Sequence, residues 1–534
     1  MIHQSLLLIL SLFFAMALLY LLSQRLKISY PIFLVIGGLA IGLVPGLPRV
    51  SITPDLVFLI FLPPLLFDAA WSSNWDQLWK WRRSILTLGI GLVLVTSAIV
   101  AHYAVLLIPG FTLALGYLLG GIISPPDAVA ATSVLKGSSV PKRGLAILEG
   151  ESLVNDAVSL TVFRFAIAAI ITGKFVVQDA LIQFFELAVM GIFVGLLIGH
   201  FLYLVIRYWV KSSSITTPIT LIAPYLMYMT AEEFNWSGVL AVVSGGLFLS
   251  FRSSDYLNYE TRLQTKEVWQ TITFLLNGFV FILIGLELPT IVSGINGYTP
   301  SLVVTYALLI SALIIVIRIV MVYLGAFIPR LLSKKIRAEE THPGYKLPFI
   351  VGWAGMRGVV SLASALAIPL TVHSGENFPE RNLIIFITFV VILVTLVFQG
   401  LTLPLFIKWL KVEEVDPSVP PDEQIAAIRL LLSKQSIEYL DTHYAEEMMK
   451  YSNIAGIREQ YLLTVTVLEN SIQDKTKAPA IKNARKLYKK IMLEILNLRR
   501  QSLRTMRAEK KYDDEVFKFL ESNLDLEEAR LYRS

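Results

Sequence analysis

The sequence predicts an all-α polytopic membrane protein with a helical cytosolic tail, and three observations support this fold class. Hydrophobic residues make up 55% of the 534 residues and charged residues only 16%, whereas soluble proteins contain about 25% charged residues. Thirteen apolar segments are long enough to cross a bilayer, and nearly half of the charged residues lie in the last quarter of the chain. These features exclude a soluble globule, a disordered chain, a collagen and a coiled coil.

The remaining composition narrows the possible functions. The chain has no cysteine, which excludes a disulfide framework and a thiolate metal site. Its formal net charge of +6 is small for this length and does not indicate a nucleic-acid partner. We expect no cofactor and no enzymatic activity.

The predicted membrane helices follow from the length of the apolar segments. A helix needs about 20 mostly apolar residues to cross the hydrocarbon core. The first segment lacks a small-residue cleavage site of the kind that ends a signal peptide, so we interpret it as a membrane span. The thirteen segments lie near residues 5–22, 31–48, 54–71, 84–108, 111–135, 144–171, 180–207, 215–231, 236–251, 268–289, 300–329, 346–371 and 382–410.

Basic residues in the loops predict the orientation. One set of alternate loops contains 18 Lys and Arg residues, and the other set contains three. The richer set is expected in the cytoplasm, because cytoplasmic loops carry an excess of basic residues. With thirteen spans, this places the N-terminus outside the cell and the C-terminal tail in the cytoplasm.

A change in composition marks the domain boundary. Residues 412–534 carry 20 Lys or Arg and 21 Asp or Glu, and prolines cluster just after residue 416. We therefore predict a transmembrane domain over 1–411 and a cytosolic helical regulatory tail over 412–534. One apolar stripe at helical spacing in the tail is expected to pack within the tail or on a partner tail; it consists of Ile481, Ala484, Tyr488, Ile491, Ile495 and Leu498.

Several ionisable residues lie within or close to the predicted spans. Each costs roughly 2.5–3.5 kcal/mol at the bilayer centre on insertion scales, so they are unexpected without a function. We expect Glu287 and Arg164 to reach a membrane interface, and several of the others to face one polar cavity. The complete set is Asp68, Asp127, Glu151, Asp156, Arg164, Glu287, Arg318 and Arg357.

The first motif is the segment 124–130 in the middle of the fifth span, with the sequence SPPDAVA. Pro125 and Pro126 remove two backbone donors and break the helical ladder. The freed carbonyls are tolerated at membrane depth only beside protein or a water-filled cavity. Broken helices of this kind bind coupling ions in secondary transporters. The alternative is a simple proline kink.

The second motif is the segment 149–157 in the sixth span, with the sequence EGESLVNDA. Ser152 and Asp156 are four residues apart and share a helix face, and Glu151 and Asn155 share a neighbouring face. A hydroxyl, a carboxamide and carboxylates are hard oxygen ligands that suit alkali cations. The alternative is a hydrogen-bonded cluster that only holds helices together.

The third motif is the segment 352–358 in the twelfth span, with the sequence GWAGMRG. Three glycines and Arg357 inside an apolar run indicate a second interrupted helix. The fifth and twelfth spans occupy corresponding places in two six-helix halves, spans 1–6 and 8–13. This arrangement predicts an inverted repeat, with the seventh span as the connector.

Four strings in this order resemble the bacterial sodium/proton antiporters of cation:proton antiporter family 1, which is related to the animal sodium/proton exchangers. They are FLPPLLFDAAW at 61–71, SPPDAVAA at 124–131, EGESLVNDAVSL at 149–160 and GWAGMRGVVSLASAL at 352–366. The resemblance covers residues 5–411. It implies thirteen helices, a dimerisation part and a mobile six-helix core in which helices five and twelve cross.

The resemblance also implies site residues. Asp156 matches the ion-binding aspartate, and Asn155 and Ser152 match its neighbours in helix six. Asp127 matches the aspartate at the helix-five break. Many family members have Thr or Val before that aspartate, whereas this chain has Pro126, whose carbonyl remains a candidate ligand.

Three further positions complete the resemblance. Asp68 matches the helix-three acid that draws cations into the cytoplasmic funnel. Glu151 and Arg318 match a structural ion pair between helices six and eleven, and Arg357 matches the arginine of helix twelve.

The resulting hypothesis is a secondary antiporter in the plasma membrane. It exchanges Na+ or Li+, and K+ as a further candidate, for H+, without a cofactor and as a homodimer, in pH and sodium homeostasis. Electrogenic relatives have two aspartates in tandem and a core lysine, where this chain has Asn155 and Arg318, so the resemblance implies one-for-one electroneutral exchange. The alternatives are an intramembrane aspartyl protease that uses Asp127 and Asp156, and a passive cation channel.

Overall fold

The structure is a computed structural model, and it describes most of the chain. The described residues are 2–26, 29–44, 57–135, 140–173, 177–210, 212–293, 298–372, 375–412, 421–473, 478–508 and 514–533. Residues 45–48 of the predicted span 31–48 and residues 54–56 of the predicted span 54–71 lie outside these ranges. Within the described ranges the elements are helical, and one isolated bridge joins Thr371 and Asn377.

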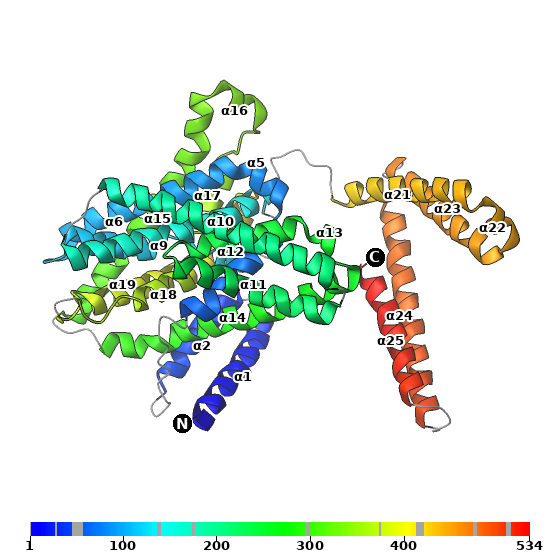
Figure 1. Ribbon diagram of the computed structural model, residues 1–534, viewed down its shortest axis with the longest axis horizontal. Helices are drawn as coiled ribbons and strands as arrows, with labels where there is room; N and C mark the ends of the chain where they lie inside the picture. Colours follow the sequence, from blue (N-terminus) through cyan, green and yellow to red (C-terminus); the bar gives the residue numbers. More distant parts are fainter. Residues whose placement is uncertain are drawn as a thin grey trace. The chain divides into compact units, whose positions relative to one another are not determined.

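The chain divides into two compact units, Met1–Asp416 and Pro417–Ser534, and each is described by itself. The helices of the first unit run from α1 to α20 and those of the second from α21 to α25 (Figure 1).

The first unit begins with the helices that correspond to the first six predicted spans. In chain order they are α1 (Ile2–Leu26), α2 (Tyr30–Gly42), η1 (Val57–Phe61) with α4 (Leu62–Ser72), α5 (Trp75–Leu86), η2 (Thr87–Leu92) with α6 (Val93–Leu107), α7 (Leu113–Ile123) with α8 (Ala128–Leu135), and α9 (Lys142–Thr172).

The remaining helices of this unit follow the connector α10 (Val177–Trp209). They are α11 (Ser213–Glu233), α12 (Gly238–Phe251), α13 (Ser253–Tyr256), α14 (Tyr259–Ser293), α15 (Pro300–Leu332), α16 (Lys334–Glu339), α17 (Lys346–Trp353) with α18 (Val359–Leu366), and α19 (Arg381–Leu393), η3 (Val394–Gln399) and α20 (Gly400–Leu410).

The all-α membrane fold predicted from the sequence is confirmed. In the described part of the chain, seven helices have the length and apolar composition needed to cross a membrane, and four shorter apolar helices accompany them. Helix occurs in each of the thirteen predicted segments. The number of thirteen crossings stays a prediction, because the shorter helices do not reach the length of a span by themselves.

Close backbone approach holds helices of the first unit together. A Cβ atom on Gly38 of α2 would lie 2.2 Å from the carbonyl oxygen of Ile282 in α14. A Cβ atom on Gly285 of α14 would lie 2.3 Å from the carbonyl oxygen of Val35 in α2. Lipid tails are as apolar as leucine, so helices in a membrane gain stability from such tight packing.

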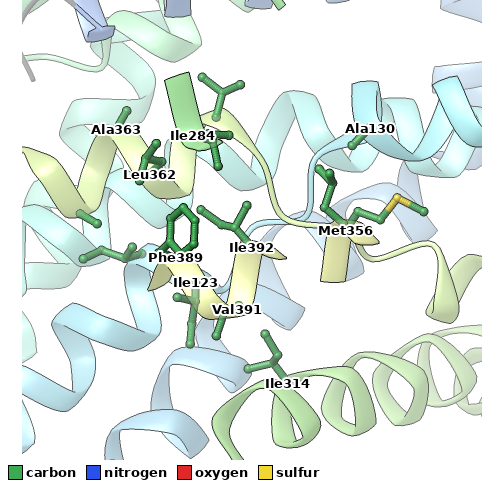
Figure 2. Close-up of a cluster of buried hydrophobic side chains, with 14 of the residues drawn as sticks. Ile123, Ala130, Ile284, Ile314, Met356, Leu362, Ala363, Phe389, Val391 and Ile392 are labelled. Carbon is green, nitrogen blue, oxygen red and sulfur yellow. The ribbon is translucent and has the colours of Figure 1, made fainter. Parts of the chain in front are cut away.

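The largest buried apolar cluster surrounds the two interrupted helices, α7–α8 and α17–α18. Figure 2 shows Ile123 of α7, Met356 from the second interruption and Leu362 of α18 in this cluster, together with Phe389 and Ile392 of α19. All five side chains are at most 5% exposed. The two breaks are therefore enclosed by protein, as irregular backbone at membrane depth requires.

The second unit contains α21 (Pro421–His443), α22 (Ala445–Lys450), α23 (Ser452–Gln473), α24 (Ala478–Ala508) and α25 (Asp514–Arg533). Helices α24 and α25 pair through ion pairs such as Arg499–Glu527 at 2.9 Å and through buried Leu496. The predicted apolar stripe is not the face that α25 covers, because Tyr488 and Leu498 are 60% and 65% exposed. Packing on a partner tail remains the open alternative for that stripe.

We predict that Gly285→Ala destabilises the protein, because the added methyl group pushes α14 away from α2. Overpacking of this kind costs about 1–3 kcal/mol. Gly91→Ala is the matched control, since a Cβ atom there meets nothing within 4 Å. Thermal unfolding of the purified variants in detergent measures the effect. Equal melting temperatures for the two variants would contradict the tight α2–α14 contact.

Candidate functional site

The two interrupted helices are joined directly at their breaks. Helix α7 ends at Ile123 and α8 begins at Ala128, while α17 ends at Trp353 and α18 begins at Val359. The backbone N–H of Asp127 donates to the carbonyl of Met356 at 2.7 Å. This hydrogen bond fixes one break against the other where the prolines have removed the helical partners.

The Asp127 carboxylate lies where two half-helices begin. Its Oδ1 accepts hydrogen bonds from the backbone N–H groups of Val129 at 2.7 Å and Ala130 at 3.4 Å, and the backbone N–H of Val359, the first residue of α18, lies close to this carboxylate. A Cβ atom on Gly358 would lie 1.8 Å from Oδ2, so only glycine permits this approach. Asp127 thus caps α8 and α18 and offsets the partial positive charge of both N-termini.

The Arg357 guanidinium lies at the C-terminal ends of the two preceding half-helices, α7 and α17. Its Nε donates to the carbonyl of Ile123 at 3.0 Å, its Nη2 to that of Ser124 at 3.5 Å, and its Nη1 to that of Gly355. The side chain is fully buried. A cation is stabilised there because the last carbonyls of a helix carry partial negative charge. The Arg357 N–H donates to Thr395 of η3 at 3.1 Å, which anchors the break to the last membrane helices.

A second buried charge pair joins α9 to α15. Arg318 donates to both oxygens of Glu151, at 2.7 Å and 3.0 Å, and the two side chains are 0% and 1% exposed. A Cβ atom on Gly355 would lie 2.0 Å from Cδ of Arg318, so this glycine makes room for the arginine. The bidentate geometry offsets much of the desolvation cost of both ions.

A cavity of about 60 Å³ lies beside the first break. Five elements line it: α4, the first break with α8, α9, α14, and the second break with α18. Its polar side chains are Asp127, Ser152, Asp156, Asn277 and Ser361. The volume is sufficient for water molecules or for one small cation.

Asp156 is the carboxylate that remains available in this cavity. The side chain is 6% exposed, and the structure records no hydrogen bond or ion pair to it from the described residues. Ser152 lies one turn earlier on the same face of α9 and is half-buried. The geometry therefore brings together Asp156, Ser152 and Asp127, three of the residues singled out from the sequence.

Other residues singled out from the sequence lie around the cavity. Asn155 is fully buried, and its Nδ2 donates to the carbonyl of Pro126 at 3.0 Å. Pro126 lines the cavity, and Asn155 is not among the lining residues. Asp68 is half-buried on α4 and lies beside Thr273 of α14, also outside the set of lining residues.

Sequence reasoning missed two polar residues of the cavity and one partner of Arg164. Asn277 of α14 and Ser361 of α18 are 2% and 1% exposed and line the cavity. The only signal for them in the sequence is a neutral polar residue inside an apolar run. Arg164 forms an ion pair with Glu232 of α11 at 2.6 Å, with side chains 39% and 29% exposed, and its position at a membrane interface stays a prediction.

The donor set limits the ligands that the cavity can hold. One free carboxylate with neutral oxygens suits a proton or a monovalent cation. Among the described residues, no group of three or more His, Asp or Glu side chains is arranged to hold a metal ion.

Comparison with known proteins gives consistent matches. The family model for the transmembrane sodium/hydrogen exchanger matches residues 9–409. An uncharacterized Na+/H+ exchanger of Mycobacterium tuberculosis is 31% identical over 515 residues, which is 96% of this chain and 93% of the relative. A sodium, potassium, lithium and rubidium/H+ antiporter of Bacillus pumilus is 31% identical over 91% of this chain and 72% of the relative.

A solved structure has the same fold. The sodium proton antiporter MjNhaP1 from Methanocaldococcus jannaschii aligns with a TM-score of 0.60 and 19% sequence identity, over 76% of this chain and 98% of that chain.

We predict that Glu151 and Arg318 are strongly coupled in stability. Removing either charge alone, as in Glu151→Gln or Arg318→Gln, leaves the other buried without its partner, which typically costs about 3–5 kcal/mol. The double variant is expected to lose less than the sum of the single variants. A double-mutant cycle in thermal unfolding measures the coupling.

The pair Arg164–Glu232 is the matched control, because its side chains are 39% and 29% exposed. Its coupling is expected to be no more than about 1 kcal/mol. If the double variant loses as much stability as the Glu151→Gln and Arg318→Gln variants together, the two residues do not stabilise each other.

Proposed function

The chain belongs to the sodium/hydrogen exchanger family and is a membrane-embedded cation/proton antiporter, and we propose that Asp156 is the group that carries the cation and the proton in turn. One observation supports this assignment above others. Asp127 accepts backbone hydrogen bonds and Glu151 is bound by Arg318, whereas Asp156 lines the cavity without a recorded partner. It is therefore the carboxylate whose oxygen lone pairs are available to a transported ion.

Competition at one carboxylate accounts for exchange. A cation and a proton each neutralise Asp156, and they cannot do so together. An empty, ionised Asp156 is an uncompensated charge that is costly to enclose in protein or lipid. The site therefore changes its exposure to either side of the membrane only when one of the two ions is bound, and this rule couples the two fluxes.

The remaining ligands follow from the cavity. Ser152 supplies a hydroxyl, and the carbonyl of Pro126 supplies an oxygen whose second lone pair is available beside the Asn155 hydrogen bond. Asp127 contributes its negative charge to the site, and Asn155 holds the break in place. Asp68 attracts cations to the site.

The transported cations that we propose are Na+ and Li+, with K+ as a further substrate, in the service of pH and sodium homeostasis. Carboxylate, hydroxyl and carbonyl oxygens can bind each of these alkali cations, by extension from other hard cations. The name of the Bacillus pumilus relative covers sodium, potassium, lithium and rubidium, which supports a broad range.

The proposed arrangement in the cell follows the charge bias of the loops. Thirteen helices within residues 1–411 span the plasma membrane, with the N-terminus outside. The tail, residues 412–534, lies in the cytoplasm and tunes transport, and two chains form a homodimer. The protease and channel alternatives have no support from the comparisons, and Asp127 is occupied by helix capping.

We predict that Asp156→Asn abolishes sodium-driven proton exchange while the protein still folds, because the amide cannot alternate between a proton and a cation. Asp156→Glu is expected to retain part of the activity with a changed apparent affinity. The measurement is the fluorescence of a pH-sensitive dye in proteoliposomes during additions of Na+, Li+ and K+.

Glu149→Gln is the control for this experiment, since Glu149 is an exposed carboxylate on the same helix. It is expected to exchange at the wild-type rate. Sodium-driven proton flux in purified Asp156→Asn protein would refute the assignment.

We predict electroneutral exchange of one cation for one proton. Asn155 cannot carry a proton charge, Arg318 is held in an ion pair with Glu151, and the Asp127 carboxylate is bound by amide donors. Only Asp156 then changes its protonation in a cycle. The test is sodium exchange in proteoliposomes with the membrane potential clamped at several values by a potassium ionophore.

A rate that is independent of voltage supports this stoichiometry. Uphill sodium movement driven by voltage alone would show that a second group, with Asp127 as the first suspect, also carries protons.

A further inference from the structure

Two polar residues of the cavity beside Asp156 have no role in the mechanism above, although one of them, Ser361, lies within the string 352–366. Asn277 comes from α14 and Ser361 from α18, and both side chains are almost completely buried, at 2% and 1% exposure. Neither residue belongs to the helix-six or helix-five motifs. They add a carboxamide and a hydroxyl to the cavity in which the transported cation is proposed to bind.

Ser361 owes its free hydroxyl to the break in its helix. Hydroxyl groups inside helices usually donate to the carbonyl four residues earlier, and Ser364 on the same helix donates to the carbonyl of Val360 at 2.8 Å. The residue four positions before Ser361 is Arg357, which lies in the non-helical break. The Ser361 hydroxyl is buried and has no hydrogen-bond partner within the described chain.

Asn277 is the second buried polar residue of the cavity. It lies in the membrane-spanning part of α14, and the structure records no hydrogen bond between its carboxamide and any described residue. A buried polar group without a partner is unfavourable unless a ligand or water satisfies it. A cation that enters the cavity satisfies an amide oxygen and a hydroxyl oxygen at once.

The other candidate ligands do not surround the cation, so Asn277 and Ser361 can complete its coordination. Oδ1 of Asp127 accepts two backbone hydrogen bonds, and its Oδ2 lies against Gly358. The carbonyl of Pro126 already accepts from Asn155. Asp156 and Ser152, both on α9, and the second lone pair of the Pro126 carbonyl are the remaining oxygen ligands, so without further ligands the cation is held from α9 and the first break alone. Alkali cations require oxygen ligands from several directions, by extension from other hard cations.

We propose that the Asn277 carboxamide oxygen and the Ser361 hydroxyl coordinate the transported cation, and that they set its selectivity among Li+, Na+ and K+. This inference rests on the proposed function of Asp156. Neutral ligands contribute to cation binding without binding the competing proton, so they shift the competition at Asp156 toward the cation. The attraction between an ion and an oxygen grows as the distance shortens, so their loss affects Li+ and Na+ more than K+.

The experiment compares Asn277→Leu and Ser361→Ala with wild-type protein in proteoliposomes, at one pH and over a range of Li+, Na+ and K+ concentrations. Each variant is expected to raise the apparent KM for Na+ about tenfold, as for the loss of one contact to a charged group. The maximal rate is expected to stay near the wild-type value, the pattern of lost ground-state binding. The ratio of the KM values for K+ and Na+ is expected to fall.

Matched variants separate ligation from structure. Ser361→Thr keeps the hydroxyl and is expected to restore the KM, and Ser364→Ala removes a hydroxyl that is already bonded within α18 and is expected to leave the KM unchanged. If Ser361→Ala does not fold, Asn277→Leu still tests the proposal, through KM in proteoliposomes and Li+ binding by calorimetry.

Wild-type KM values for all three cations in both variants, or a lower maximal rate at unchanged KM, would overturn the proposal. Asp156→Asn is measured in the same series. Exchange in that variant would refute the proposed function itself, whereas an inactive Asp156→Asn together with unchanged KM values would refute only the roles of Asn277 and Ser361.

Discussion

Two helices that break at the depth of the membrane expose backbone amides and carbonyls for which lipid offers no hydrogen-bond partner, and the core of this protein is arranged around that constraint. Each helix end carries roughly half an elementary charge. Two N-termini therefore face Asp127 with about +1, and two C-termini face Arg357 with about −1. The contacts of Asp127 with Val129 and of Arg357 with Ile123 show that each ion meets the ends of opposite sign.

This charge compensation determines which carboxylate is available to bind a cation or a proton. Asp127, Arg357, Glu151 and Arg318 sum to zero charge, and each is bound by backbone groups or by its partner. Asp156 lies beside them in the cavity without such a partner. One unbalanced charge beside fixed charges that cancel is what an exchanger needs, since the bound ion then decides whether the site is neutral enough to be enclosed.

The sequence predicts the parts of this arrangement that local chemistry dictates. The all-α fold follows from apolar segments as long as the bilayer is thick, and the breaks follow from Pro125–Pro126 and from the glycines near Arg357. It does not predict that Gly358 is needed because Asp127 approaches it, since those residues lie far apart in the chain. It also does not single out Asn277 or Ser361, because neutral polar residues occur often in apolar helices and only the fold shows that they share a cavity with Asp156. The role of Asp156 as carrier stays a prediction.

The same constraint explains why neutral oxygens are the useful additions to the site. A further free carboxylate would leave the core with a second unbalanced charge, which would then have to bind its own proton or cation in every cycle. A carboxamide or a hydroxyl strengthens cation binding and leaves the charge count unchanged. In a core whose fixed charges already cancel, cation affinity can therefore be adjusted through residues such as Asn277 and Ser361, while the stoichiometry remains set by Asp156 alone.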